Sequence, residues 1–117
     1  MRHAFTVGVV AAALMLGTAV AATAQITEDN VAEMVHKAST SAEHTALADY
    51  FRAQAKVASE QAGKHRAMLV GASPKSSRHV WDAHCKRLIR SFENEAAAYI
   101  DLAKEQDVLA KHAEQKH

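Results

Sequence analysis

Side chains that bind soft metal ions are grouped in two short stretches of the sequence. His65 and Met68 are three residues apart, and His84 is followed directly by Cys85. On a helix a spacing of three places two side chains on the same face, and imidazole, thiolate and thioether donors suit Cu(I) or Zn²⁺. His79 is a reserve ligand. These residues predict a copper or zinc site, provided that the fold brings the two stretches together.

The same residues also have a purely structural interpretation, which the sequence leaves open. A histidine at a helix–helix interface often hydrogen-bonds across it and sets the register, methionine fills gaps in cores, and unpaired cysteine packs as a small apolar residue. A second group, His36, His44 and His112, favours such structural roles over a site. Cys85 and His65 lack the third, orienting group of a nucleophilic pair. We therefore expect a protein that is not an enzyme.

Three helices are predicted to position these residues. Thr27, followed by two acidic residues, indicates the start of a short first helix that extends to about Ala38. Thr40 with Glu43 forms a capping-box pattern, so a second helix begins there. It continues to about Val70.

A short connection separates the second helix from the third. Gly71 and Pro74 provide the stop, and Ser76 and Ser77 can cap a third helix that extends to about Ala113. Because the connection is short, the two long helices are predicted to be antiparallel neighbours. The fold class is therefore all-α, a hairpin of two long helices with a short N-terminal helix.

Each long helix carries a row of residues with alternating spacings of three and four, which is the pattern of a coiled-coil seam. On the second helix the row is His44, Ala48, Phe51, Ala55, Ala58, Ala62, His65 and Leu69. On the third helix it is Trp81, Cys85, Leu88, Phe92, Glu95 or Ala96, Tyr99, Leu102, Gln106, Leu109 and Ala113.

Folding the hairpin pairs positions whose numbers sum to about 150. This register places His65 opposite Cys85 and His44 opposite Gln106. Small residues then face large ones along most of the seam, as close packing requires; the predicted pairs are Leu69 with Trp81, Ala62 with Leu88, Ala58 with Phe92, and Ala48 with Leu102. Two helices alone form a thin core. The sequence leaves a compact monomer and a homodimer that forms a four-helix bundle as equal alternatives.

The first 24 residues read as an export signal. Arg2 precedes an apolar run, and the segment ends in small residues at Ala22, Thr23 and Ala24 before Gln25, which suits cleavage by a signal peptidase. The run is shorter than the ~20 residues that cross a bilayer, although an uncleaved anchor stays open. We expect a periplasmic protein whose single helical domain comprises residues 25–117, with no stable membrane insertion after cleavage.

Charge and composition narrow the class of partner. The formal net charge of the 117 residues is +1, so the chain lacks the basic excess that nucleic-acid binding requires. One cysteine excludes a disulfide within the chain. The expected functions are therefore soft-metal binding or, alternatively, a structural or stress-related interaction module of the cell envelope.

Several local sequences resemble a family of small proteins. They are TSAEH at 40–44, LADYF at 47–51, KHRAM at 64–68, HCKRL at 84–88, and Tyr99 with Leu102 and Ala103. Together they are similar to a group of small exported Gram-negative helical proteins, mostly labelled hypothetical. The resemblance covers most of residues 25–117. It implies a periplasmic helical hairpin and no particular activity.

Overall fold

The computed structural model describes residues 25–70 and 78–116, with the side chains of Val70, Arg78 and His79 excepted. The predicted signal at 1–24, the connection with Gly71 and Pro74, and the caps Ser76 and Ser77 lie outside the described residues. Three helices are present in the described part: α1 (Val31–Lys37), α2 (Ser41–Val70) and α3 (Arg78–Gln115). Among them, none is long and apolar enough to cross a membrane.

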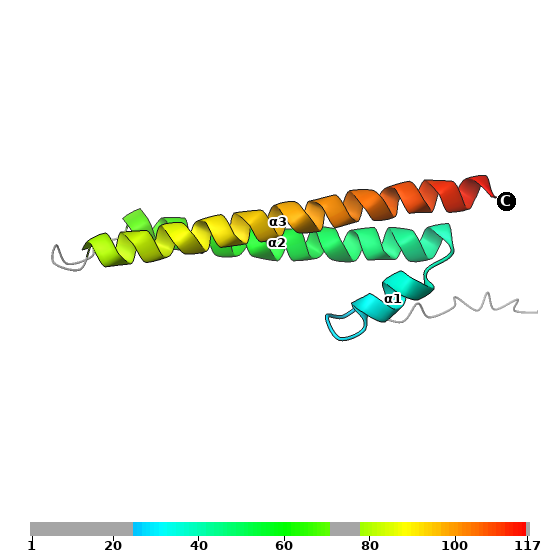
Figure 1. The fold of residues 1–117 in the computed structure, drawn as a ribbon, viewed down its shortest axis with the longest axis horizontal. Coiled ribbons are helices and arrows are strands. Elements are labelled where there is room, and N and C mark those ends of the chain that lie inside the picture. Colours follow the sequence, from blue (N-terminus) through cyan, green and yellow to red (C-terminus); the bar gives the residue numbers. More distant parts are fainter. Residues whose placement is uncertain (1–24, 71–77, 117) are drawn as a thin grey trace, which may run out of the picture.

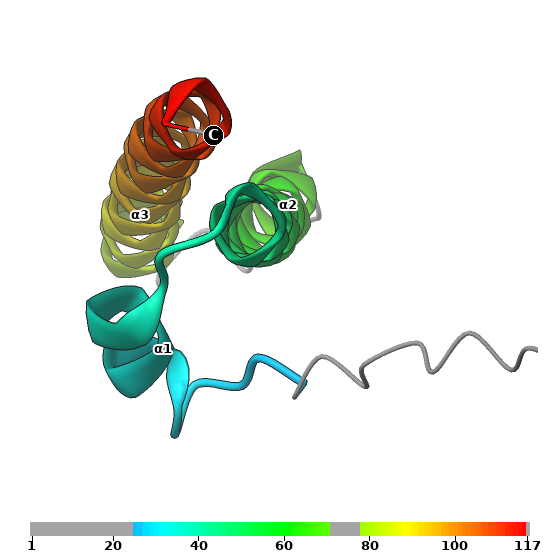
Figure 2. The same cartoon turned by 90° about the vertical axis from the view of Figure 1, so that its right-hand side faces the viewer.

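The two long helices pack antiparallel along their length, as predicted (Figure 1). The end where the chain passes from α2 to α3 is called the turn end, and the end with the start of α2 and the end of α3 is called the open end. α1 lies beside the open-end half, and the view along the helices shows it on one side of the α2–α3 pair (Figure 2).

The start of α2 is the predicted capping box. Thr40 Oγ1 accepts a hydrogen bond from the Glu43 N–H at 3.2 Å, and a Glu43 carboxylate oxygen accepts from the Thr40 and Ser39 N–H groups at 3.0 and 2.7 Å. These reciprocal bonds satisfy amides that the helix leaves unpaired. Backbone donors from Ser39 and then Thr40 lower the pKa of Glu43, although the carboxyl is fully exposed.

The first helix begins later than predicted. Residues 28–30 form a turn before it, which is closed by the Asn30 and Val31 N–H groups that donate to the Thr27 carbonyl at 3.2 and 2.9 Å. Asn30 Oδ1 accepts from the Thr27 N–H at 2.8 Å, and its Nδ2 donates to the Gln25 carbonyl at 2.9 Å. These bonds satisfy groups that precede the helix, and α1 itself begins at Val31. On its exposed face Lys37 pairs with Glu33 and lowers the pKa of that carboxyl.

The seam of α2 is as predicted, whereas that of α3 is partly wrong. On α2 the described seam residues from His44 to Ala62 are buried, and His65 and Leu69 are half-buried. On α3 one predicted row is correct: Cys85, Phe92, Tyr99, Gln106 and Ala113 are buried or half-buried.

The second row of the α3 seam is shifted by one residue from the prediction. Ile89, Ala96, Ala103 and Ala110 are buried, while Leu102 and Leu109 are 38% and 42% exposed and Trp81 is 41% exposed. Leu88 is half-buried. The shift keeps Glu95 out of the seam and brings alanines to an α2 surface that is itself rich in alanine. The predicted pairing of α2 alanines with large residues of this row is therefore incorrect, because small side chains on both helices allow a close approach.

The register of the hairpin is nevertheless the predicted one. His44 Nδ1 lies 2.8 Å from Gln106 Oε1 in the buried seam, and the Phe51 and Tyr99 rings stack with centroids 6.2 Å apart. Both pairs have numbers that sum to 150. Because a glutamine Oε1 only accepts, His44 Nδ1 carries the proton and donates it.

α1 covers a small aromatic cluster on the open-end half. Leu47, Phe51 and Ala103 are buried there. The half-buried residues packed against them are Ile26, Val31, Met34, Val35, Ala38, Tyr50 and Tyr99. Burial, with smaller contributions from Tyr99 and Glu28, raises the pKa of Tyr50. Leu47 lies outside the predicted seam and is buried because α1 packs beside it.

Candidate functional site

Two of the predicted metal ligands lie in the seam near the turn end. Cys85 is fully buried as a free thiol, and His65 is half-buried with its ring stacked on Phe92 at a centroid distance of 5.6 Å. The confirmed register places His65 and Cys85 in the same layer. His65 Nδ1 is buried and has no hydrogen-bond partner in the described part of the chain. This orphaned nitrogen is the one feature of the layer that packing alone leaves unexplained.

The other predicted ligands do not lie in the seam. Met68 is 43% exposed, and His84 is exposed beside Trp81, with ring centroids 6.4 Å apart. The His79 side chain lies outside the described residues. Across residues 25–70 and 78–116, no group of three or more His, Cys, Asp or Glu side chains is placed to hold a metal ion. Of the five predicted ligands, the structure thus places His65 and Cys85 in the seam and leaves Met68 and His84 exposed.

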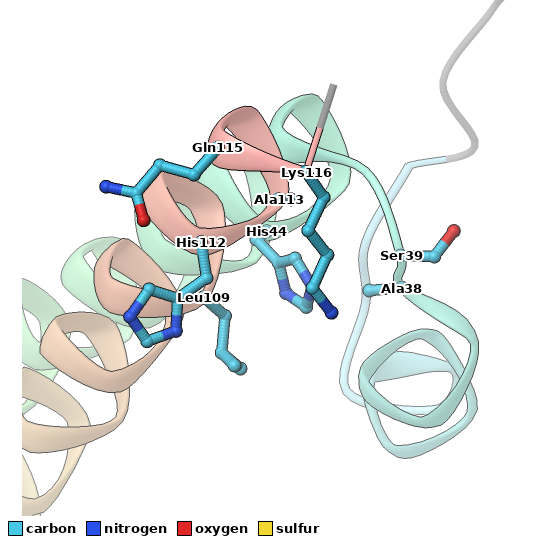
Figure 3. A pocket seen from close by; sticks show the side chains of 8 residues that line it. All are labelled: Ala38, Ser39, His44, Leu109, His112, Ala113, Gln115 and Lys116. Carbon is cyan, nitrogen blue, oxygen red and sulfur yellow. The ribbon is translucent and has the colours of Figure 1, made fainter.

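A pocket of about 440 Å³ lies at the open end, beside the chain between α1 and α2 (Figure 3). His44 and His112 both line it, together with Leu109 and Lys116. The ring of His44 is held by Gln106. His36, the third member of this predicted group, is exposed on α1 and does not line the pocket. The Lys116 ammonium group disfavours a metal cation here, so a structural role for His44 remains the better interpretation.

The two flanks of the α2–α3 seam differ in chemistry. One flank, called here the ion-pair flank, carries interactions between the helices: Arg52 with Asp107, Arg66 with Glu93, and the Ser41 hydroxyl with Glu114 at 3.0 Å. Because Glu93, Asp107 and Glu114 are separated by multiples of seven, they share one edge of the seam. Polar contacts between α2 and α3 therefore line this side of the seam.

The opposite flank, called here the apolar flank, carries large apolar side chains instead. On α3 they follow a seven-residue spacing, and α2 contributes one more near the turn end; the members are Met68, Trp81, Leu88, Leu102 and Leu109. α1 lies on this side, since Leu47 packs under it and Leu109 lines the pocket beside Ala38 and Ser39. Sequence reasoning missed this flank because it assigned the α3 members to the seam.

Charge is segregated along the hairpin, which the balanced total conceals. Residues 61–70 and 78–90, at the turn end, contain six basic and one acidic residue, whereas residues 25–50 and 101–116, at the open end, contain nine acidic and four basic residues. Counting each end separately would have found this signal. The two ends of the molecule therefore present potentials of opposite sign.

Comparisons with family models, curated proteins and solved structures find no match to the chain. The similarity to small exported helical proteins remains a prediction. Function is accordingly argued from the residues and their placement.

Proposed function

We propose that the protein is a non-enzymatic helical interaction module of the cell envelope that binds another helical surface along its apolar flank. The observation that carries the proposal is the exposure of this flank: Met68, Trp81, Leu102 and Leu109 are each between 38% and 43% exposed. A row of apolar side chains at seven-residue spacing is the surface that a further helix recognises. Its location in the envelope rests on the predicted signal at residues 1–24.

The flank is better suited to helix binding than the other exposed apolar residues. Ile100 is 39% exposed, but at seven residues from both Glu93 and Asp107 it lies on the charged ion-pair flank. Val80 and Val108 are more exposed, at 78% and 51%, and point away from the seam as single residues. Isolated apolar residues are ordinary on protein surfaces, whereas several apolar residues aligned on one flank, here interrupted on α3 by Glu95 alone, mark an interaction surface.

Photo-cross-linking in cells tests the proposal. A photoreactive phenylalanine analogue replaces Leu102 on the apolar flank or, as the matched control, Ile100 on the ion-pair flank, which has nearly the same exposure. We expect adducts heavier than the chain from position 102 and few from position 100. Equal adducts from both positions, or none from position 102, would contradict the proposed role.

A second candidate function is soft-metal binding, and we propose it for His65 and Cys85 alone. The supporting observation is the buried, unpaired Nδ1 of His65 in the layer of the buried Cys85 thiol. An imidazole nitrogen and a thiolate are donors that suit Cu(I) or Zn²⁺. Metal binding would supply the partner that His65 Nδ1 lacks.

Competitive Cu(I) and Zn²⁺ titrations of the reduced protein test the second candidate. Cys85→Ala and His65→Phe should each abolish stoichiometric binding, while His112→Ala, at the far end of the hairpin, should bind as the parent does. Circular dichroism of each variant verifies that the helices persist. Binding by the parent that survives both seam substitutions would refute this site.

A further inference from the structure

We propose that the partner of the apolar flank is a second copy of this chain, arranged antiparallel so that the turn end of each hairpin lies beside the open end of the other. The inference rests on the proposed interaction role and names its partner. Three independent features of the described residues support it: the symmetry of the apolar row, the segregation of charge, and the position of α1.

The apolar row on α3 is symmetric about its centre. Trp81 and Leu88 precede Glu95 by fourteen and seven residues, and Leu102 and Leu109 follow it at the same distances. A two-fold axis at Glu95 therefore sets Trp81 against the partner's Leu109, and Leu88 against the partner's Leu102. An isologous interface requires such a self-complementary surface, because the same residues serve on both sides.

Charge favours the antiparallel arrangement over the parallel one. The turn end has a net charge of +5 over residues 61–70 and 78–90, and the open end has −5 over residues 25–50 and 101–116. Antiparallel pairing places opposite potentials side by side at both ends, whereas parallel pairing places like potentials together. Since the attraction acts between exposed groups, it should weaken as salt rises.

The position of α1 leaves space for the partner. α1 lies beside only the open-end half of the hairpin (Figures 1 and 2), and no described helix covers Met68 and Trp81 at the turn end. Leu102 and Leu109 also remain exposed beside α1. In the antiparallel dimer the uncovered turn end of one copy packs beside the α1-covered open end of the other. Each copy then adds two helices to a four-helix bundle.

Glu95 is the exception in this interface and provides a direct test. The two-fold axis brings the two exposed Glu95 carboxylates near each other, which disfavours association. Glu95→Gln should therefore lower the dimer Kd several-fold. Asp101→Asn removes the same charge from the outward face of α3 and should leave the Kd unchanged.

The experiment is sedimentation of protein expressed from the full chain, over a dilution series. The sole tryptophan, Trp81, lies in the interface, so its emission should shift to shorter wavelength as the dimer forms. Leu102→Glu should raise the Kd at least tenfold, while the matched Ile100→Glu should not. Increasing the salt from 0.05 to 0.5 M should also raise the Kd.

Orientation is tested by oxidation of the Glu95→Cys and Leu102→Cys variants. Position 95 faces itself at the axis, whereas position 102 faces the partner's Leu88, so Glu95→Cys should form a disulfide-linked dimer while Leu102→Cys and Ile100→Cys stay monomeric on a denaturing gel. A parallel dimer would instead link Leu102→Cys as readily as Glu95→Cys. A protein that sediments as a monomer throughout, with Glu95→Gln included, overturns the inference, as does a dimer that Leu102→Glu leaves intact.

Failure of self-association remains distinguishable from failure of the interaction role. Cross-links from position 102 to a protein of another mass, with no adduct of twice the chain, would retain the role and reject the second copy. Binding of the monomer to phosphatidylglycerol vesicles through the basic turn end would also reject it, in favour of a membrane surface.

Discussion

At the scale of single residues, one buried polar pair defines the register of the hairpin. His44 and Gln106 are 8% and 5% exposed, and they hydrogen-bond to each other in a seam made mostly of alanine. Alanine rows by themselves distinguish poorly between alignments, because each layer resembles the next. The buried His44 donor meets its acceptor in only one alignment, and every other alignment would leave it unpaired at a cost in free energy.

Removing one member of this pair should cost more than removing both. Gln106→Leu leaves the His44 Nδ1–H group without an acceptor, and we expect it to lower the free energy of unfolding by about 1–3 kcal/mol. The double variant His44→Leu/Gln106→Leu should recover most of that loss. Chemical denaturation measures both; a double variant less stable than the single one would contradict the role of the pair.

At the scale of elements, the helix starts depend on side chains close in sequence. The α2 capping box is specified by Thr40 and Glu43 alone, so its prediction is confirmed. The α1 start was mispredicted by four residues, because a turn at residues 28–30, closed on the Thr27 carbonyl and bound by the Asn30 side chain, precedes the helix. At both helix starts a side chain three residues ahead accepts a hydrogen bond from a backbone N–H group that has no helical partner.

The capping box makes the stability of α2 depend on acid. The Glu43 pKa is lowered in the folded protein from its ordinary value of 4.5, so its stabilising effect is complete above that value and is lost as pH falls through the folded pKa. Once Glu43 is protonated, the thermal midpoint of the parent should therefore be lower than it is at neutral pH. The difference in thermal midpoint between the parent and Glu43→Gln should narrow between pH 6 and pH 3; a constant difference would show that the charge is not involved.

Close packing of α2 and α3 depends on alanine in the seam. Ala62 is fully buried, and a leucine there would separate the helices. Ala62→Leu should cost about 1–3 kcal/mol through overpacking. The control Ala67→Leu, at an exposed position of the same helix, should stay within about 0.5 kcal/mol of the parent. Denaturation midpoints compare the two, and equal midpoints would mean that the seam tolerates larger side chains.

At the scale of the whole molecule, the two ends of the hairpin differ in whether α1 packs on them and in the sign of their net charge. α1 packs on the open-end half through one small cluster around Phe51, while the turn-end half of the apolar flank has no such cover among the described helices. The basic and acidic ends add a long-range polarity. These two asymmetries make an antiparallel partner complementary at both ends.

α1 should open more readily than the helices it covers, because it is short and rests on few buried side chains. Its amides should exchange with deuterium faster than seam amides near Cys85. Met34→Ala removes a half-buried contact with the cluster, which should destabilise the packing of α1 by up to about 2 kcal/mol. The exchange rate of the α1 amides should then rise more than tenfold, while the exchange rate near Cys85 stays the same. Equal acceleration in both regions would show that α1 and the seam open together.

The sequence alone determined the features that follow from local or strictly periodic signals. These are the two long helices, the capping box at Thr40, the α2 seam and the alignment of His44 with Gln106. Spacing and capping act within a few residues of the chain, so their physical effect can be predicted without knowing what packs on them.

Only the tertiary structure decided which of two rows on α3 enters the seam. Leu102 and Ala103 belong to adjacent rows with the same periodicity, and hydrophobicity alone favours leucine. Close approach of the alanine-rich helices selects Ala103 instead, and leaves Leu102 on the apolar flank. His65 and Cys85, by contrast, were already assigned to the seam by their spacing in the sequence. Periodicity identifies candidate faces, but the fit between two surfaces determines which face is buried.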